Sequence, residues 1–156
     1  VLFRSRVIAL SQLVEYRNGG LAASIVPFFQ KDLVKKLESD LKHWGLLNVE
    51  CIWGDIEKRG GTKISDHSMD AVIISNVLFQ SEDKLGLIDE AKRVLKKGGR
   101  VLFIDWNESF GGMGPAPEHV VTKSMAKELF VKRGFEVVEE ISTSPHHYGI
   151  IFTTNE

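Results

Sequence analysis

Apolar and polar positions along the first half of the chain predict strands separated by a helix. Nearly continuous apolar runs at residues 21–29 and 49–53 are typical of strands covered on both faces. Between them, residues 31–44 carry apolar side chains at helical spacing, and Gly45 follows as a helix stop. Nearer the start, we expect residues 7–14 to form the tail of a helix.

The same alternation continues through the middle of the chain. Residues 70–76 have the pattern of a buried strand with polar side chains at its exit. Ser81 is placed to cap the next helix, whose apolar face runs on until Gly98 and Gly99 end it. Residues 100–104 then predict a further strand.

One more helix and two strands complete the chain. Thr122 is expected to cap the helix and Gly134 to close it. The runs 135–141 and 148–153 predict strands separated by too few residues for a crossover helix. This last pair should therefore be an antiparallel hairpin at the sheet edge.

These elements together predict an α/β fold with a Rossmann-like, mostly parallel sheet, helices on both of its faces and a carboxyl-terminal antiparallel β-hairpin. The chain has 156 residues, of which 43% are hydrophobic and 26% charged. These values are ordinary for a globular protein, and we expect a single domain over residues 1–156.

The charge balance narrows the class of partner. Twenty Lys and Arg residues against 21 Asp and Glu give a net charge of −1, which argues against a nucleic-acid-binding surface. No apolar run approaches the roughly 20 residues of a membrane span. Cys51 is the single cysteine and lies in an apolar run, so a buried thiol in a reducing, cytoplasmic compartment is expected.

Two sequence motifs resemble a known family. Residues 70–78 (DAVIISNVL) are similar to the fourth-strand motif of class I S-adenosylmethionine-dependent methyltransferases. Residues 91–101 (AKRVLKKGGRV) resemble the helix, glycine turn and fifth strand of the same family. The resemblance covers roughly residues 22–152 and implies a Rossmann-like domain that uses S-adenosylmethionine for methyl transfer.

The chain also departs from the family pattern near its amino terminus. The family's first strand and glycine-rich loop are not found in the sequence, and residues 1–6 fit no element, so we expect the domain to be incomplete there. Phe28 or Phe29 stands where the family has an acid that grips the ribose hydroxyls. Truncated or frameshifted coding, or real loss of cofactor binding, would explain both departures. We expect the 156-residue chain to bind S-adenosylmethionine weakly or not at all.

Two functions therefore stay open. One is methyl transfer to a small molecule by the full-length form, and the other is a non-catalytic remnant that binds no cofactor. A nicotinamide-dependent oxidoreductase is less favoured, because it needs the same missing fingerprint and does not ordinarily end in this hairpin.

The resemblance implies four cofactor-binding residues. Asp55 corresponds to the acid that reaches the adenine amino group, and Ile56 would pack against the ring. The alternative for Asp55 is a helix cap. Asn76 and Val77 leave the fourth strand where the family lines the methionine and substrate side, and a plain polar turn is the alternative.

Candidate acceptor residues follow the fourth and fifth strands. Methyl transfer is an in-line displacement on an activated carbon, so alignment supplies much of the catalysis. Asp105 is placed to position or deprotonate an acceptor, or else to cap the following loop. Phe79 is expected to fill the core or to close the pocket. We expect Phe110 and Met113 to line the pocket from the loop at 107–119, although that loop is also consistent with a tolerated insertion.

Two further patterns limit the chemistry. Residues 75–79 (SNVLF) are not the Asp/Asn-Pro-Pro-aromatic stretch of related nucleic-acid methyltransferases, so a small-molecule acceptor is favoured. His146 and His147 are adjacent in an extended segment and face opposite sides, so no metal site is expected there.

Overall fold

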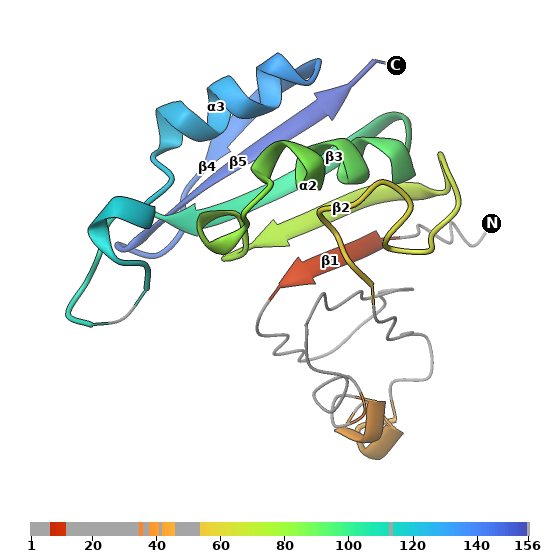
Figure 1. Ribbon diagram of the computed structural model, residues 1–156, viewed down its shortest axis with the longest axis horizontal. Coiled ribbons are helices and arrows are strands. Elements are labelled where there is room, and N and C mark those ends of the chain that lie inside the picture. Colours follow the sequence, from red (N-terminus) through yellow and green to blue (C-terminus); the bar gives the residue numbers. More distant parts are fainter. Residues whose placement is uncertain are drawn as a thin grey trace.

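The computed structural model describes residues 7–11, 35, 38–40, 42–45, 54–112 and 114–155. In this part of the chain, five strands form one sheet in the order β1-β2-β3-β5-β4 (Figure 1). The strands are β1 (Val7–Ser11), β2 (Met69–Ser75), β3 (Leu95–Trp106), β4 (Phe135–Ile141) and β5 (His147–Thr154). β1, β2 and β3 run parallel, whereas β5 is antiparallel to both β3 and β4.

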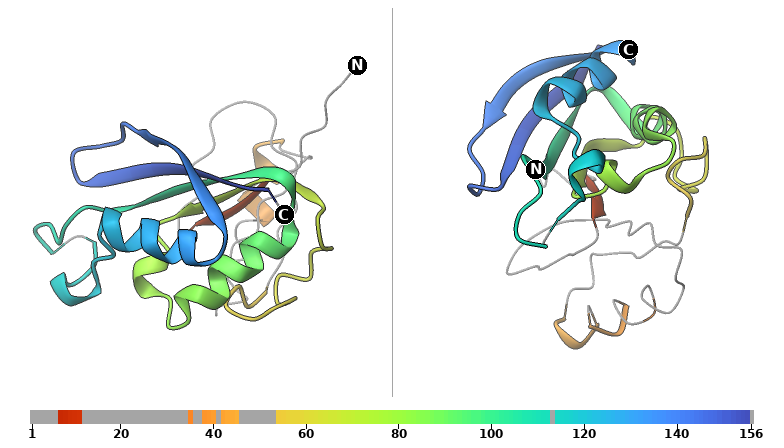
Figure 2. Two further views of the ribbon diagram at one scale, coloured as in Figure 1. Left: turned by 90° about the horizontal axis from the view of Figure 1, so that it is seen from above. Right: turned by 60° about the vertical axis from the view of Figure 1, so that its left-hand side comes forward.

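The helices α2 (Lys84–Val94) and α3 (Lys123–Lys132) lie on the same face of this sheet (Figure 2). Two short 3₁₀ helices, η1 (Leu78–Gln80) and η2 (Pro117–His119), follow β2 and β3. Helical backbone also occurs at residues 38–40 and 42–43, before Gly45 with its φ of +69°. None of the helices in the described ranges is long and apolar enough for a membrane span.

The core lies between the sheet and these two helices. Alternate residues of β2 and β3 point to the same face and are fully buried, as the two-residue period of a strand requires. Phe130 from α3 stacks on Phe152 from β5 with ring centroids 4.1 Å apart. The fully buried side chains of this core include Val72, Ile74, Leu87, Ile88, Val101, Phe103, Phe130 and Phe152.

The carboxyl-terminal elements agree with the prediction from sequence. Thr122 caps α3, and its hydroxyl accepts a hydrogen bond of 3.3 Å from the Met125 N–H. Gly134 follows α3 with a φ of +82°, a conformation that glycine adopts without steric cost. β4 and β5 form the expected antiparallel hairpin.

The prediction of a helix tail at residues 7–14 is wrong where the structure describes it. Val7–Ser11 is β1, which pairs in parallel with β2 so that Ile8 lies opposite Val72. A short apolar run fits a strand and a buried helix equally well, and here the pairing with β2 selects the strand.

The predicted ends of α2 are also wrong. Asp83, not Ser81, is the N-cap, and its carboxylate accepts a hydrogen bond of 2.8 Å from the Gly86 N–H. At the other end the helix stops at Val94, before the two glycines, because Leu95 already pairs with Met69 in the ladder between β2 and β3.

Some predicted elements lie outside the described residues. They include the strands expected at 21–29 and 49–53, and with them Phe28, Phe29 and Cys51.

Candidate functional site

The carboxyl ends of β2 and β3 lie side by side and are tied together. Asn76, the residue after β2, donates its backbone N–H to the Ile104 carbonyl oxygen at 3.0 Å. Its φ of +55° turns the chain away from the sheet, and asparagine tolerates this left-handed conformation better than most residues. The Asn76 Oδ1 atom is buried and has no hydrogen-bond partner in the protein.

The segment after Asn76 turns into η1 and contributes two of the predicted site residues. Val77 is 7% exposed and belongs to the core, so its backbone rather than its side chain is available at the strand end. Phe79 is partly buried and packs against the same core. Gln80 closes the turn, because its Nε2 donates to the Asn76 carbonyl oxygen at 3.1 Å.

Asp105 lies near the end of β3 and is almost completely buried. Its side chain is 1% exposed; Oδ1 accepts a hydrogen bond of 2.9 Å from the Trp106 N–H, and Oδ2 has no partner. Burial raises the pKa of this carboxyl to about 7, although the Trp106 and Phe79 N–H groups and the charge of Lys84 oppose the rise. The carboxyl group can therefore hold or release a proton near neutral pH.

Asp55 lies on the turn-rich loop between Gly54 and Ile64, and its carboxylate is half-buried. Oδ1 accepts from the Glu57 N–H at 3.1 Å, and Oδ2 lies 3.0 Å from Nζ of Lys58, whose side chain is 80% exposed. Residues 56–68 contain turns and no helix, so Asp55 caps a turn rather than a helix. The side chain of Ile56 is 5% exposed and is part of the core.

The loop after β3 is anchored on the turn between β4 and β5. Asn107 donates its backbone N–H to the His146 carbonyl oxygen at 2.9 Å and its Nδ2 to that of His147 at 2.8 Å. The Phe110 ring, 40% exposed, stacks on His146 with centroids 3.7 Å apart. Gly114 packs against the indole of Trp106, where an added Cβ would lie 2.7 Å from a ring carbon.

The structure thus brings Asn76, Val77, Phe79 and Asp105 together at one end of the sheet. Phe110 is held against the hairpin, and Met113 lies outside the described residues. Reasoning from sequence missed the acidic residues Glu57 and Glu90, which bind the Asp55 loop to α2. The available signal was Glu90 itself, a charged residue within the apolar stripe of an amphipathic helix.

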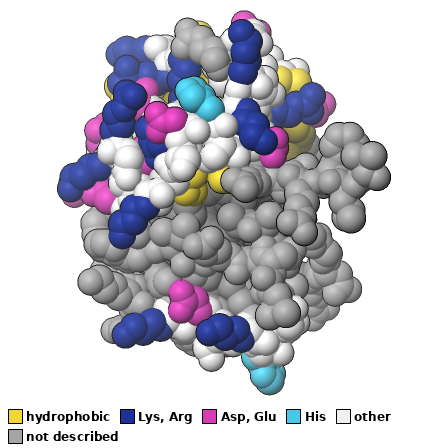
Figure 3. Space-filling model, turned by 90° about the vertical axis from the view of Figure 1, so that its right-hand side faces the viewer, with side chains coloured by type: hydrophobic (Ala, Val, Ile, Leu, Met, Phe, Trp, Pro, Cys, Tyr) yellow, Lys and Arg dark blue, Asp and Glu magenta, His cyan; other side chains and the backbone are white. Residues whose placement is uncertain are grey.

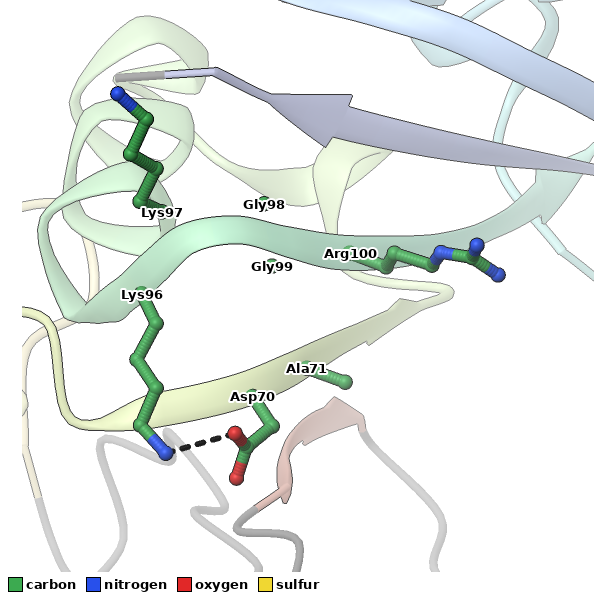
Figure 4. A pocket seen from close by; sticks show the side chains of 7 residues that line it. All are labelled: Asp70, Ala71, Lys96, Lys97, Gly98, Gly99 and Arg100. Carbon is green, nitrogen blue, oxygen red and sulfur yellow. Dashed lines mark hydrogen bonds and ion pairs between the residues drawn. The ribbon is translucent and has the colours of Figure 1, made fainter.

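A cavity elsewhere on the sheet does not belong to this site. It lies at the start of β2 and β3, the opposite end from Asn76 and Asp105, and is lined by Asp70, Ala71, Lys96, Lys97, Gly98, Gly99 and Arg100 (Figure 4). Lys96 is paired with Asp70 at 2.7 Å, and the side chains of Lys97 and Arg100 point in different directions (Figure 4). Apart from this ion pair, the described polar side chains of the lining do not converge on one point of the cavity (Figure 4).

The face of the molecule in Figure 3 shows no patch of one charge, and the described residues include no cluster of metal-binding side chains. Basic and acidic side chains are mixed on the described surface seen in Figure 3. Within the described ranges, no group of three or more His, Cys, Asp or Glu residues could hold a metal ion.

The sheet order and the terminal hairpin define a Rossmann-like α/β domain. In open α/β sheets, ligands generally bind at the carboxyl ends of the parallel strands. Residues 21–103, more than half of the chain, match the family model described as a methyltransferase domain. The chain belongs to this family, and its fold is that of class I S-adenosylmethionine-dependent methyltransferases.

Individual relatives agree with this assignment. Human arsenite methyltransferase is 38% identical over 73 residues, which make up 46% of this chain and 20% of that enzyme. A SAM-dependent methyltransferase from Aquifex aeolicus superposes with a TM-score of 0.73 at 21% identity, covering 84% of this chain and 67% of the other. The chain therefore spans about a fifth of the length of the curated relative.

The same fold also occurs in a protein with another reaction in its name. The [4+2]-cyclase SpnF superposes with a TM-score of 0.75 at 12% identity, over 96% of this chain and 74% of that protein. Fold alone does not fix the reaction, so the site residues must carry the functional argument.

Proposed function

We propose that the full-length protein transfers the methyl group of S-adenosylmethionine to a small-molecule acceptor. The observation that carries this proposal is the pair of unpartnered oxygen atoms, Asn76 Oδ1 and Asp105 Oδ2, at the carboxyl ends of neighbouring parallel strands. Buried polar atoms are nearly always hydrogen-bonded in native proteins. A ligand with N–H or O–H donors at this edge would satisfy such atoms.

The described residues offer hydrogen-bond acceptors where S-adenosylmethionine has donor groups. Among the described residues, the Asp55 carboxylate contacts a turn N–H and an exposed lysine, so it has lone pairs for the adenine amino group. Asn76 and the backbone of Val77 would line the methionine side, and Ile56 supports the loop beside the adenine from within the core. When bound, the cofactor supplies an activated methyl group on a sulfonium.

The acceptor lies, in this proposal, between the end of β3 and the loop at 107–119. Asp105 positions the acceptor or takes up its proton, and Phe79, Phe110 and Met113 line the pocket. The loop-cap alternative for Asp105 also has support, because Oδ1 accepts from the N–H of Trp106. The protein would work in the cytoplasm without a nucleic-acid or membrane partner.

A small acceptor is supported by two observations. The chain carries a net charge of −1, and its relative of 38% identity is named for methylation of arsenite, a small inorganic molecule. The proposal stops at the class of acceptor, and arsenite is one member of the panel that should be tested.

The test uses the full-length protein and S-adenosylmethionine labelled in its methyl group. We expect label to pass to a small molecule recovered in the protein-free filtrate. A folded protein that neither binds S-adenosylhomocysteine in calorimetry nor transfers label would instead support a non-catalytic remnant.

A further inference from the structure

A single carboxylate from α2 holds the loop that carries Asp55. Glu90 lies on the buried side of the helix, and its side chain is 1% exposed. Oε2 accepts a hydrogen bond of 2.7 Å from the Gly60 N–H. Oε1 accepts from the N–H of Thr62 at 3.1 Å and from its hydroxyl at 2.5 Å.

Arg93, one helical turn further on, completes this network. Its Nε and Nη2 donate to the two carboxylate oxygens of Glu90, each at 2.8 Å. Its Nη1 donates to the Ile64 carbonyl oxygen at 2.7 Å and pairs with Asp66. Burial alone would raise the pKa of Glu90, but the hydrogen bonds from Arg93, Thr62 and Gly60 lower it to about 2. The pair is therefore charged at physiological pH.

The segment 60–62, which Glu90 holds by hydrogen bonds, is directly linked to Asp55. Gly61 lies between Gly60 and Thr62, and its carbonyl oxygen accepts the Asp55 N–H at 3.1 Å. The approach is so close that a Cβ on Gly61 would overlap the Asp55 carbonyl oxygen. Movement of residues 60–62 would thus move the backbone of Asp55.

A second attachment of the loop lies at the beginning of α2. The Glu57 carboxylate accepts hydrogen bonds from the Ser81 hydroxyl at 2.8 Å, the Glu82 N–H at 3.2 Å and the Asp83 N–H at 2.9 Å. Glu57 lies two residues after Asp55, so the segment that follows the candidate adenine acid is attached to α2 at two points, Glu57 and residues 60–62.

We propose that Glu90 and Arg93 are positioning residues for adenine recognition, which they serve by fixing the loop that presents the Asp55 carboxylate. This inference rests on the proposed cofactor role of Asp55. A buried ion pair is a weak source of net stability compared with apolar packing, but it imposes a defined geometry because both partners must stay paired. A loop that must present one carboxylate to a ligand needs such a geometry.

The test compares two ligands that differ at the group Asp55 recognises. S-adenosylhomocysteine carries the adenine amino group, whereas S-inosylhomocysteine has a carbonyl oxygen there, which a carboxylate repels. For the full-length wild-type protein we expect calorimetry to give a preference of about tenfold or more for the adenosyl ligand, the effect of one lost hydrogen bond.

In Glu90→Gln, an amide replaces the carboxylate that accepts hydrogen bonds from Gly60, Thr62 and Arg93. The amide NH2 group is itself a donor and cannot accept them. We expect the preference between the two ligands to fall to about twofold or less, with most of the loss in adenosyl-ligand affinity. Asp89→Asn, on an exposed side of the same helix, is the matched control and should keep the wild-type ratio. A general loss of stability would weaken both ligands alike and leave the ratio unchanged.

A folded Glu90→Gln protein with the wild-type ratio would overturn the inference. Should that variant not fold, Arg93→Lys carries the same test, because it keeps the charge and loses the two-pronged contact with Glu90. Failure of the proposed function itself gives a different result, since the wild-type protein would then bind neither ligand or show no preference between them.

Discussion

Asp105 on β3 lies directly opposite Tyr148 on β5 in the antiparallel ladder. The Tyr148 hydroxyl donates its hydrogen bond to the Val121 carbonyl oxygen at 2.7 Å and therefore does not donate to the Asp105 carboxyl group. Burial, and then the charge of Asp105, raise the pKa of Tyr148. The end of β3 therefore holds a carboxyl group with few compensating donors.

This arrangement predicts a pH-dependent stability. Burial raises the pKa of Asp105 from 3.8 to about 7, so between these values the folded state holds a proton that the unfolded state releases. The stabilising contribution is complete below pH 3.8 and is lost as pH rises through about 7, by up to about 4 kcal/mol. Asp105→Asn should flatten this slope in urea unfolding at pH 5 and pH 8, whereas Asp89→Asn should not. An unchanged slope in Asp105→Asn would contradict the buried-carboxyl account.

The cap of α3 gives a second prediction. Thr122→Ala removes the hydroxyl that accepts the Met125 N–H, and should lower the free energy of unfolding by about 1 kcal/mol. Ser124→Ala, at an exposed position in the first turn of the same helix, is the control and should change stability little. Chemical denaturation of both variants checks this, and equal losses would remove the capping role from Thr122.

Gly114 tests how the loop at 107–119 is held against the end of β3. Gly112 and Gly114 both have positive φ values, +79° and +76°, so alanine strains the backbone similarly at either position. Only Gly114 also touches Trp106, whereas a Cβ on Gly112 meets nothing within 4 Å. We expect Gly114→Ala to shift the tryptophan emission and to weaken acceptor use more than Gly112→Ala does. The same effect from both variants would show that the Trp106 contact does not seat the loop.

The proposed pocket predicts a separation between acceptor and cofactor. Alanine at Phe110 and Met113 should raise the acceptor KM in the active full-length protein while the dissociation constant of S-adenosylhomocysteine stays nearly unchanged. Steady-state kinetics and calorimetry make the comparison. A fall in cofactor affinity with unchanged acceptor constants would assign the loop to the cofactor side.

Sequence alone predicted those parts of the fold in which local signals and tertiary contacts agree. The hairpin of β4 and β5 and the Thr122 cap were predictable, because a short link and a polar cap act locally. The strand at Val7–Ser11 was not, because its partner β2 is more than fifty residues away in the chain. The start of β3 was missed for the same reason, since Leu95 is fixed by pairing with β2.

Some residues of the candidate site could likewise be predicted from the sequence, and others could not. Asn76 and Asp105 were predicted as candidate site residues because polar residues at the exit of a buried strand are recognisable in the sequence, and the structure places both at the carboxyl ends of β2 and β3. The Glu90 network was not, because its partners in the loop at 60–66 come together only when α2 packs beside that loop.

The central claim is that this fold holds S-adenosylmethionine through the loop that carries Asp55. Calorimetric titration of S-adenosylhomocysteine into the full-length protein and its Asp55→Ala variant tests this most directly. The account predicts binding by the wild-type protein and a loss of about 1 to 3 kcal/mol in a variant that stays folded. Equal dissociation constants for the two proteins, or no binding by a folded wild-type protein, would contradict it.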